Sequence, residues 1–463
     1  MSPAETPAPQ GPMGPAYRLV TVMMLAQVTL VAFESMAVTT AMPTVARELD
    51  AVRSYGLAFS LFLSAQLLGT VLAGSWCDAR GTLPPLLTGQ LGLAAGSLLA
   101  GAAPTFPLLL LGRVVAGLGG GLLVVALYVM IGRAYPDALR PKVFGWLSAA
   151  WVLPSIVGPL LAAWLTEAWS WRGVFLVCVA PILLTGVATW VKRATVDPPG
   201  HESSGRERHE HARAAVAGTA VALGAGALQW GSQYVEPPRP LPLVVAGIGV
   251  AVVALVAPRL VPRGTVRMGR GLPSVMLARF LLTASFNGAI TFVPLMLVNE
   301  RSRSSTTAGV MLTLGSLGWS LGAALQGRES LSSRPSRLLA GGGALVATGM
   351  LALVAVMGLG LSEWLVPLAV LLLGSGMGLA MSTTSVLALD LTPVEQHGQA
   401  SSSLQLADAL GSALGVALTG AVFAALHRAP GEDTGAYLLI WACCAASGAL
   451  VVLAGRRSRP VGP

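Results

Sequence analysis

The sequence predicts an all-α membrane protein built from many spanning helices, and three features support that fold class. Hydrophobic residues make up 54% of the chain and charged residues only 11%, whereas a soluble domain carries about 25% charged residues. Glycine is abundant, with 55 residues, and small residues let helices approach closely in a bilayer. The apolar residues also occur in long runs, as spanning helices of roughly 20 residues require.

Reading along the chain for such runs predicts fourteen spans. The seventh and eighth are shorter than most and are flanked by charged loops. The fourteen runs cover residues 18–42, 56–77, 84–103, 107–132, 143–166, 173–191, 214–232, 241–260, 273–298, 306–326, 337–360, 364–388, 400–426 and 435–454.

The basic residues predict the orientation of these spans. Of the 29 Lys and Arg residues, 20 lie in segments on the same side as the N-terminus and seven lie in segments on the other side. The remaining two, Arg113 and Arg279, fall within apolar runs. Because basic residues concentrate in cytoplasmic loops, we expect a multi-pass protein of a prokaryotic plasma (inner) membrane with both termini in the cytoplasm. The net charge of +9 does not indicate a nucleic-acid partner, because it is spread over short connections.

The connections divide the spans into six, two and six. The linker KRATVDPPGHESSGRERHEHAR is charged and contains Pro, Gly and Ser, which is typical of a cytoplasmic connection between bundles. The glycine tracts GLGGG and GSGMG occupy the same position in the two sets of six and suggest related halves. The expected parts are a disordered tail (1–16), an N-terminal six-helix bundle (17–191), the linker (192–213), two inserted helices (214–262), a C-terminal six-helix bundle (263–455) and a basic cytoplasmic tail (456–463).

The connection GSWCDARG between the second and third spans predicts a contact that controls conformation at the cytoplasmic end. Asp78 and Arg80 lie where a carboxylate pairs with a basic group or a helix N-terminus. A latch of this kind, bounded by Gly74 and Gly81, would hold one packing of two bundles and release it in the other. A plain helix-ending turn with charged residues is the alternative.

The fourth and fifth spans contain further candidates for conformational gating. Arg113 lies in the apolar sequence LLLLGRVVAGLGGG, so it needs an acceptor or water, unless it snorkels to the outer surface. Glycines around and after it permit close helix approach. In the fifth span, Pro154 and Pro159 each remove a helix hydrogen bond and favour a kink. Gly158 precedes the second of these prolines.

Taken in order, these motifs resemble the major facilitator superfamily. The set comprises the GxxxDxxG spacing, Arg113 with its glycine-rich tail, Gly158-Pro159 and WSWRGVF at 169–175. The inserted pair with QWGS, the segment FESMAVTTAMPTVAREL and the segment VPLMLVNERSRSSTTAGVML are similar to the fourteen-span drug:proton antiporter branch. The resemblance covers residues 17–455. It implies two six-helix bundles plus two additional helices, and transport by alternating access.

Two motifs depart from the family pattern. Ala79, Thr82 and Leu83 stand where the family usually has basic residues, so the latch retains only Arg80. In the fifth span, Pro154 replaces the leading glycine of the antiporter motif, and two alanines replace its closing glycines.

Polar residues inside the spans predict the transport site. Gln27 and Glu34 are seven residues apart and share one helix face, which we expect to look into the bundle because lipid would penalise both. In the thirteenth span Gln405 and Asp408 belong to a polar stripe that also includes two serines. Asn287 lies in the ninth span.

Glu34 is the predicted proton carrier, and Asp408 is a second acid for proton coupling or substrate contact. Burial in a low dielectric favours the protonated carboxyl, and a cargo that competes for the same charge makes proton and cargo exclude each other. The alternative is a carboxylate that neighbouring hydroxyls and amides satisfy and that only fixes helix packing. Trp151 and Trp319 are expected to stack on substrate, unless they belong to the aromatic belts at the membrane surface.

The predicted function is therefore proton-coupled export of amphipathic organic compounds, as in multidrug efflux and antibiotic resistance. We expect a monomer in contact with lipid, with no cofactor, no metal and the proton gradient as energy source. Transport of one dedicated metabolite or lipid is the alternative. A membrane-embedded enzyme or a channel is less well supported, because the five histidines lie in the linker and loops.

Overall fold

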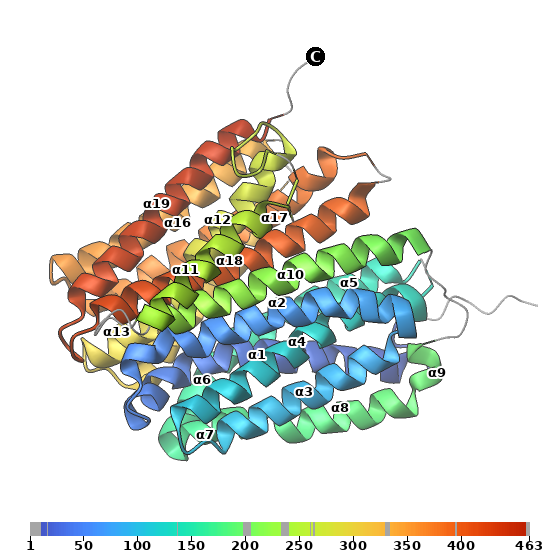
Figure 1. Ribbon diagram of the computed structural model, residues 1–463, viewed down its shortest axis with the longest axis horizontal. Helices are drawn as coiled ribbons and strands as arrows, with labels where there is room; N and C mark the ends of the chain where they lie inside the picture. The colour runs from blue at the N-terminus through green and yellow to red at the C-terminus, as the bar shows by residue number, and fades with distance from the viewer. Residues whose placement is uncertain are drawn as a thin grey trace, which may run out of the picture.

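The computed structural model contains only helices and connections within the residues that it describes (Figure 1). The described residues are 11–15, 17–136, 138–197, 205–232, 240–259, 261–262, 264–328, 334–393 and 396–459. The predicted tail at 1–16 and the predicted linker at 192–213 therefore lie partly outside them, as do the last residues of the predicted basic tail at 456–463.

The N-terminal half forms one helical bundle. Its longest helices, α1, α2 and α4, place the candidate residues Glu34 and Arg113 inside the bundle. The half contains α1 (Arg18–Glu48), η1 (Val52–Ser54), α2 (Tyr55–Arg80), α3 (Leu83–Gly101), α4 (Phe106–Ala134), α5 (Arg140–Ala149), α6 (Val152–Ala168), α7 (Trp171–Leu176), α8 (Val179–Val191) and α9 (Arg193–Val196).

The C-terminal half forms a second bundle, and a pair of helices joins the two. The pair, α10 (Gly205–Ser232) and α11 (Pro240–Val256), ends in η2 (Ala257–Arg259). Helix α10 packs against both α2 and α18, so it runs along the junction of the two bundles (Figure 1). The second bundle contains α12 (Leu272–Ile290), α13 (Val293–Asn299), α14 (Ser305–Gln326), α16 (Pro335–Gly358), η3 (Glu363–Leu365), α17 (Val366–Asp390), α18 (His397–Leu426) and α19 (Thr434–Arg457).

Twelve helices of the described chain are long and apolar enough to cross a membrane, so the predicted count of fourteen is not confirmed. Two of the predicted spans account for the difference. The fifth is divided into α5 and α6, and α6 has only 17 residues. The seventh is α10, whose 28 residues begin with the charged sequence GRERHEHAR.

Three of the predicted spans are broken, and each break is followed by a proline. Helices α6, α8 and α13 begin just before Pro154, Pro181 and Pro294 respectively. Proline lacks an N–H group and its ring clashes with the carbonyl four residues earlier, but the first turn of a helix tolerates it. The carbonyl of Ala150, which Pro154 leaves without a helical donor, accepts a hydrogen bond from Thr29 Oγ1 at 3.4 Å. The fifth span is thus interrupted before Pro154, whereas Pro159 lies inside α6, which continues through it. Whether either proline kinks the span stays a prediction.

Glycines hold the central helices of each half at backbone contact distance. A Cβ added at Gly117 or Gly121 of α4 would lie 2.3 or 2.1 Å from a carbonyl oxygen of α2. In α17, a Cβ at Gly374 or Gly378 would lie 1.9 or 2.0 Å from a carbonyl oxygen of α14. The same helices pack through other glycines on α3 and α16. Helices α4 and α17 thus occupy equivalent positions, as the two glycine tracts predicted.

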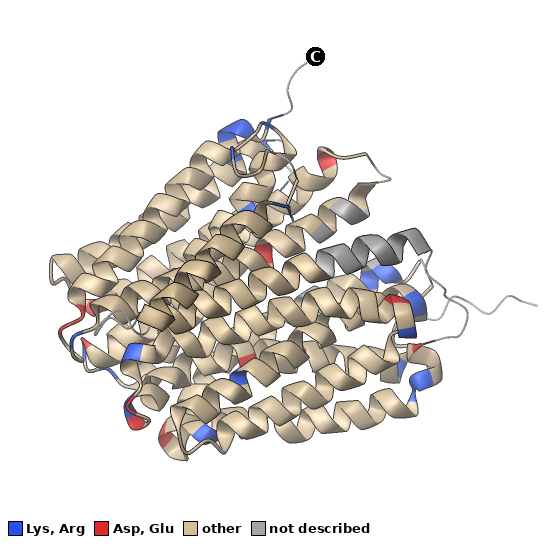
Figure 2. Ribbon diagram, viewed as in Figure 1, with Lys and Arg blue, Asp and Glu red and all other residues tan. Residues whose placement is uncertain are grey.

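The bundle has two ends, which we distinguish by the positions of the chain termini. We call the end that contains the start of α1 and the end of α19 the terminal end, and the other the opposite end. Charged residues gather mainly at these two ends, with few between them (Figure 2). At the terminal end, the carbonyl of Arg457 accepts a hydrogen bond from Gly271 N at 2.9 Å, and the rings of Tyr17 and Tyr135 stack with centroids 5.2 Å apart.

The glycine contacts predict a difference between two alanine substitutions in α4. Gly121→Ala forces the new methyl group into the backbone of α2, and overpacking of this kind costs about 1–3 kcal/mol. Gly132→Ala is the matched control, because a Cβ there meets nothing within 4 Å. Unfolding in detergent micelles, followed by tryptophan fluorescence, should show a lower midpoint for Gly121→Ala only. Equal midpoints would contradict the close packing of α2 on α4.

Candidate functional site

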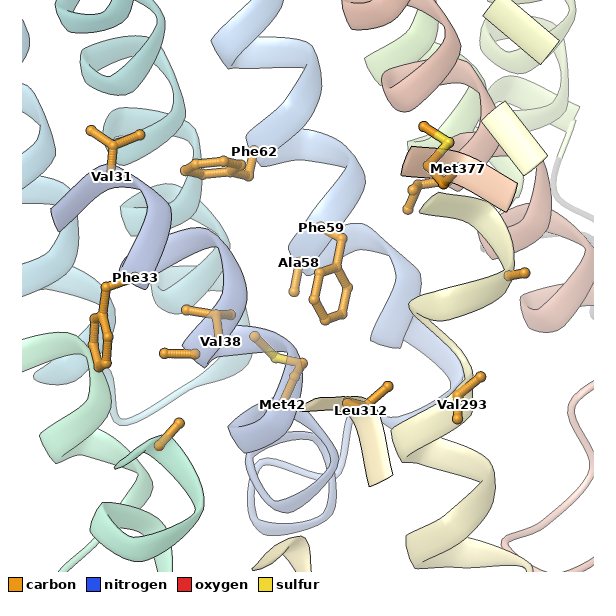
Figure 3. Packing of buried hydrophobic residues seen from close by; sticks show 14 of the residues in the cluster. Val31, Phe33, Val38, Met42, Ala58, Phe59, Phe62, Val293, Leu312 and Met377 are labelled. Atoms are coloured by element: carbon orange, nitrogen blue, oxygen red, sulfur yellow. The ribbon is translucent and has the colours of Figure 1, made fainter. Parts of the chain in front are cut away.

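A cavity of about 450 Å³ lies between the two bundles. Helices α1, α2, α4, α6, α12, α14, α17 and α18 contribute to its wall. The wall is largely aromatic and aliphatic, and the rings of Phe286 and Trp319 meet edge to face with centroids 5.5 Å apart. Phe59 and Leu312 bring side chains from both halves to the same wall (Figure 3).

The cavity is closed on the side of the opposite end. Thr44 Oγ1 lies 3.0 Å from Ser305 Oγ, and the Arg53 Nε–H donates to the carbonyl of Ala424 at 3.1 Å. A Cβ at Gly56 would lie 2.7 Å from the Cα of Gly420. On each of the four helices α1, α2, α14 and α18, these contacts lie nearer the opposite end than the cavity residues do. The two bundles therefore meet directly there.

Glu34 and Arg113 form a buried ion pair inside the N-terminal bundle. Their side chains are 1% and 2% exposed, and Arg113 Nη1 donates to Glu34 Oε1. The Arg113 Nε–H donates to the carbonyl of Ala58 at 3.0 Å, and its guanidinium lies 4.0 Å from the centroid of the Phe62 ring. Arg113 lines the cavity, whereas Glu34 lies behind it and does not. Arg113 was predicted to need an acceptor, and that acceptor is Glu34.

A second ion pair lies on the C-terminal side of the cavity. Arg279 Nε donates to Asp408 Oδ1 at 3.2 Å, and Arg279 Nη1 donates to Met381 O and Thr384 Oγ1 at 3.0 and 3.1 Å. Here the carboxylate lines the cavity, while the arginine does not. Asn287 also lines it and donates from Nδ2 to Ser412 Oγ at 3.1 Å.

The structure brings three of the five predicted pocket residues together, since Asn287, Trp151 and Trp319 line the cavity. Asp408, predicted for proton coupling, and Arg113 and Pro159, predicted for gating, line it as well. The other two predicted pocket residues, Gln27 and Gln405, do not. Gln27 is buried within the N-terminal bundle, where its Nε2 donates to Thr189 Oγ1 at 3.1 Å, and Gln405 is exposed on α18. A residue on the polar face of a helix therefore does not necessarily line the cavity.

The predicted latch at the terminal end contains a carboxylate that the sequence reading missed. Asp197, after α9, accepts from Arg133 Nη1 and from Leu83 N, both at 3.3 Å. Gly81 ends α2 with φ +84°, and a Cβ there would lie 2.1 Å from Asp197 Oδ2, so glycine is required for this contact. Arg80 is exposed beside it.

The remaining predicted gating residues contribute less to close packing. Gly74 has nothing within 4 Å of an added Cβ, and Gly158 has only ordinary contacts, the nearest at 3.7 Å to Met36 and Phe33. Asp78 is partly buried and does have an interaction partner. Whether Asp78 takes part in gating stays a prediction.

A second polar cluster joins helices at the opposite end of the C-terminal bundle. Glu300 Oε1 accepts from the backbone N–H groups of Gly431 and Asp433, both at 3.2 Å. His427 Nδ1 lies 2.7 Å from Asp433 Oδ2. Burial raises the pKa of Glu300 above its ordinary value, and the nearby charge of Asp433 adds to that effect, while the two backbone donors oppose it. These contacts fix the loop between α18 and α19.

Neither of the two buried ion pairs was predicted from the sequence. Arg279 was recognised as a charge within an apolar run but was not linked to Asp408, and Glu34 was not linked to Arg113. The sequence did contain a signal for this pairing, because two arginines and two carboxylates lie away from the ends of the spans in the predicted bundles. Buried charges are usually paired, so pairing was the simplest arrangement. In the part of the chain that the structure describes, no group of three or more His, Cys, Asp or Glu residues forms a metal site.

Comparison with known proteins identifies the family. The model of the Major Facilitator Superfamily matches residues 24–416. The chain belongs to this superfamily. The predicted family is thus confirmed, and its members and structural neighbours are transporters rather than enzymes.

Curated relatives of the chain include uncharacterized transporters, a multidrug efflux pump and a multidrug resistance protein. An uncharacterized MFS-type transporter of Mycobacterium tuberculosis is 28% identical over 404 residues, which cover 83% of this chain and 56% of that protein. The chain thus spans little more than half the length of that relative. The multidrug efflux pump SdrM of Staphylococcus aureus is 26% identical over 36% of this chain and 38% of its own. Multidrug resistance protein 3 of Bacillus subtilis is 28% identical over 35% and 32%.

Solved structures share the fold over nearly the whole chain. A peptide transporter, POT, in complex with alafosfalin has a TM-score of 0.69 at 14% identity, covering 95% of this chain and 94% of its own. A bacterial homolog of the human lysosomal transporter Spinster has a TM-score of 0.67 at 16% identity, covering 96% and 98%. At these identities the likeness concerns the fold alone.

The buried pair predicts a nonadditive effect on stability. Arg113→Gln leaves the Glu34 carboxylate buried without its cation, and breaking a buried pair in this way costs about 3–5 kcal/mol. The double variant Glu34→Gln/Arg113→Gln removes both charges and should recover much of that loss. Unfolding of the three proteins in the same detergent measures the difference. A double variant that is less stable than Arg113→Gln would contradict this account.

Proposed function

We propose that the protein is a proton-coupled secondary transporter that exports amphipathic organic compounds by alternating access. The proposal rests on the position of the Glu34–Arg113 pair at the cavity. The arginine lies on the cavity wall, and the carboxylate lies behind it. A proton on Glu34 would therefore change the charge that the cavity presents to cargo.

The coupling follows from electrostatics. With Glu34 ionised, the pair is neutral and the adjoining wall carries no net charge. A proton on Glu34 removes its charge, so Arg113 remains as an uncompensated cation at the cavity. An organic cation is then repelled, and in turn a bound cation disfavours the proton. Mutual exclusion of two ligands is the condition for antiport.

The character of the cavity wall supports amphipathic cargo. Aromatic side chains such as Phe286, Trp151 and Trp319 offer flat apolar contacts. Asp408 offers a carboxylate that a cation can share with Arg279. The multidrug efflux pump of S. aureus and the multidrug resistance protein of B. subtilis among the relatives support multidrug efflux and a role in antibiotic resistance.

Closure at the opposite end supports alternating access. We propose that both termini are cytoplasmic, in agreement with the distribution of Arg and Lys, and that this state faces the cytoplasm. We further propose that α5 with α6, and also α10, cross the membrane, which gives fourteen spans. Helix α10 lies between α2 and α18 as a spanning helix would. The expected form is a monomer that needs no cofactor beyond the proton gradient.

The proposal predicts that Glu34→Gln abolishes proton-driven efflux of ethidium, an organic cation, from cells that express the protein. Gln keeps an oxygen for Arg113 but cannot carry the proton. Glu432→Gln, at an exposed carboxylate in the loop before α19, is the matched control and should export normally. Efflux from wild-type cells that survives collapse of the proton gradient would contradict antiport, and unchanged efflux by Glu34→Gln would remove Glu34 from the mechanism.

A crosslink tests alternating access directly. Thr44 and Ser305 face each other with oxygens 3.0 Å apart, so Thr44→Cys/Ser305→Cys should form a disulfide that locks the opposite end closed. Ethidium efflux should stop on oxidation and return on reduction, whereas each single cysteine variant should be insensitive to oxidation. Full efflux by the crosslinked protein, with the disulfide verified by mass spectrometry, would contradict the proposed movement.

A further inference from the structure

A column of buried polar side chains runs through the N-terminal bundle outside the cavity. Gln27 of α1 and Gln90 of α3 both donate from Nε2 to the hydroxyl of Thr189 on α8, at 3.1 and 3.0 Å. All three are at most 1% exposed. None of them lines the cavity. Since both amides point their nitrogen at one hydroxyl, their oxygens face elsewhere.

Four oxygens in this region have no partner among the protein atoms. They are Gln27 Oε1, Gln90 Oε1, Ser97 Oγ and Glu34 Oε2. Leaving a buried acceptor unsatisfied destabilises the folded protein. Buried water satisfies such groups where it finds two to four polar partners. Four unsatisfied acceptors on helices α1 and α3, one of them a carboxylate, therefore indicate a site for water.

These four residues form two pairs, one on α1 and one on α3, and the members of each pair are two helical turns apart. Gln27 and Glu34 are seven residues apart on α1, and Gln90 and Ser97 are seven residues apart on α3, so each pair shares a helix face and spans about 10 Å. The shared bond to Thr189 brings the two helices together at Gln27 and Gln90. At the other level, Gly112 beside Arg113 packs on Gly96 and Ala100 of α3. Ser97 thus lies at the level of the ion pair.

We propose that this column binds a file of water molecules that carries protons between Glu34 and the terminal end of the N-terminal bundle. Cargo would occupy the cavity, so proton and cargo follow separate routes. In the state with the opposite end closed, the protonated carboxyl of Glu34 passes its proton to the first water, the carboxylate pairs again with Arg113, and a proton leaves from the last water. The inference rests on the proposed proton-coupled function.

The groups around Glu34 are consistent with this direction. Arg113 lies on its cavity side, and the thiol of Cys178, buried between α7 and α8, lies close enough to sense the charge of Glu34. Toward the terminal end, the next polar residue of α1 is Thr21, whose hydroxyl lies 2.8 Å from that of Tyr135. Thr21 precedes Gln27 by six residues on α1, or about 9 Å. No described carboxylate of the column other than Glu34 competes for the proton.

The test separates proton movement from cargo movement in vesicles that contain the full chain. Thr189→Val keeps the shape of the side chain but removes the hydroxyl, and Gln90→Leu removes the amide. Both should lose ethidium accumulation driven by a pH gradient. Exchange of ethidium for ethidium without a gradient should stay within about twofold of wild type, because it moves cargo only. Thr189→Ser, which keeps the hydroxyl, should restore driven accumulation.

Matched controls keep the outcome decisive. Gln229→Leu changes a buried glutamine of α10, outside the column, and should leave both activities intact. Ser97→Val and Ser97→Thr have equal bulk, so only the first should lose driven accumulation. If Thr189→Val and Gln90→Leu keep driven accumulation, the water file is wrong but the proposed function still stands. If these variants lose exchange and driven accumulation equally, the residues have a packing role and the water file is also wrong. A wild type without any gradient-driven accumulation would overturn the proposed function as well.

Discussion

The ion pair between Glu34 and Arg113 is the interaction on which the rest of the structure depends. Two opposite charges inside a low-dielectric bundle are each costly alone, and they become tolerable only together with additional hydrogen bonds. Arg113 meets that condition through the carbonyl of Ala58 and the ring of Phe62, so the pair ties α1, α2 and α4 together. The same contact also decides what the cavity presents to cargo, since one member lies on the wall and the other behind it.

This pair requires the glycine packing beside it. Arg113 contacts Ala58, Gly117 packs on Phe62, and Gly121 packs on Gln66, so each step of four residues on α4 meets a step of four on α2. The two backbones must run in contact for the guanidinium to reach a main-chain carbonyl of α2. A side chain at Gly117 would separate the helices and withdraw that acceptor. The close glycine packing of α4 on α2 and the hydrogen bonding of Arg113 therefore depend on each other.

The sequence predicted the class of fold well, because the bilayer limits spanning structures to a few kinds. Long apolar runs indicated the helices, and the prolines indicated where one of them breaks. The number of spans was harder, because α6 is short and α10 begins with charged residues. Gly74 carries no close contact although it belongs to the motif, which shows that a motif position does not determine local packing.

The site was less predictable, because a helix face does not say which neighbour it meets. Glu34 and Gln27 do share one face of α1, as the spacing indicated. That face looks into the N-terminal bundle rather than into the cavity, so Gln27 meets Thr189. Asn287 and Trp319 reach the cavity only because two bundles come together around it. Contacts between distant segments depend on tertiary packing, which periodicity within one helix does not contain.

The two ion pairs are arranged in opposite order around the cavity, and in the mechanism we propose this order gives the two acids different roles. In the N-terminal half the cation lines the wall and the carboxylate is hidden; in the C-terminal half Asp408 lines the wall and Arg279 is hidden. A cationic cargo can therefore touch Asp408 directly, but it can sense Glu34 only through Arg113. In the proposed mechanism, protonation of Glu34 would act on cargo at a distance, without proton and cargo competing for the same atoms. Such an arrangement would let one proton site serve cargoes of different shapes, because coupling would depend on the charge of the cavity wall and not on how each cargo fits.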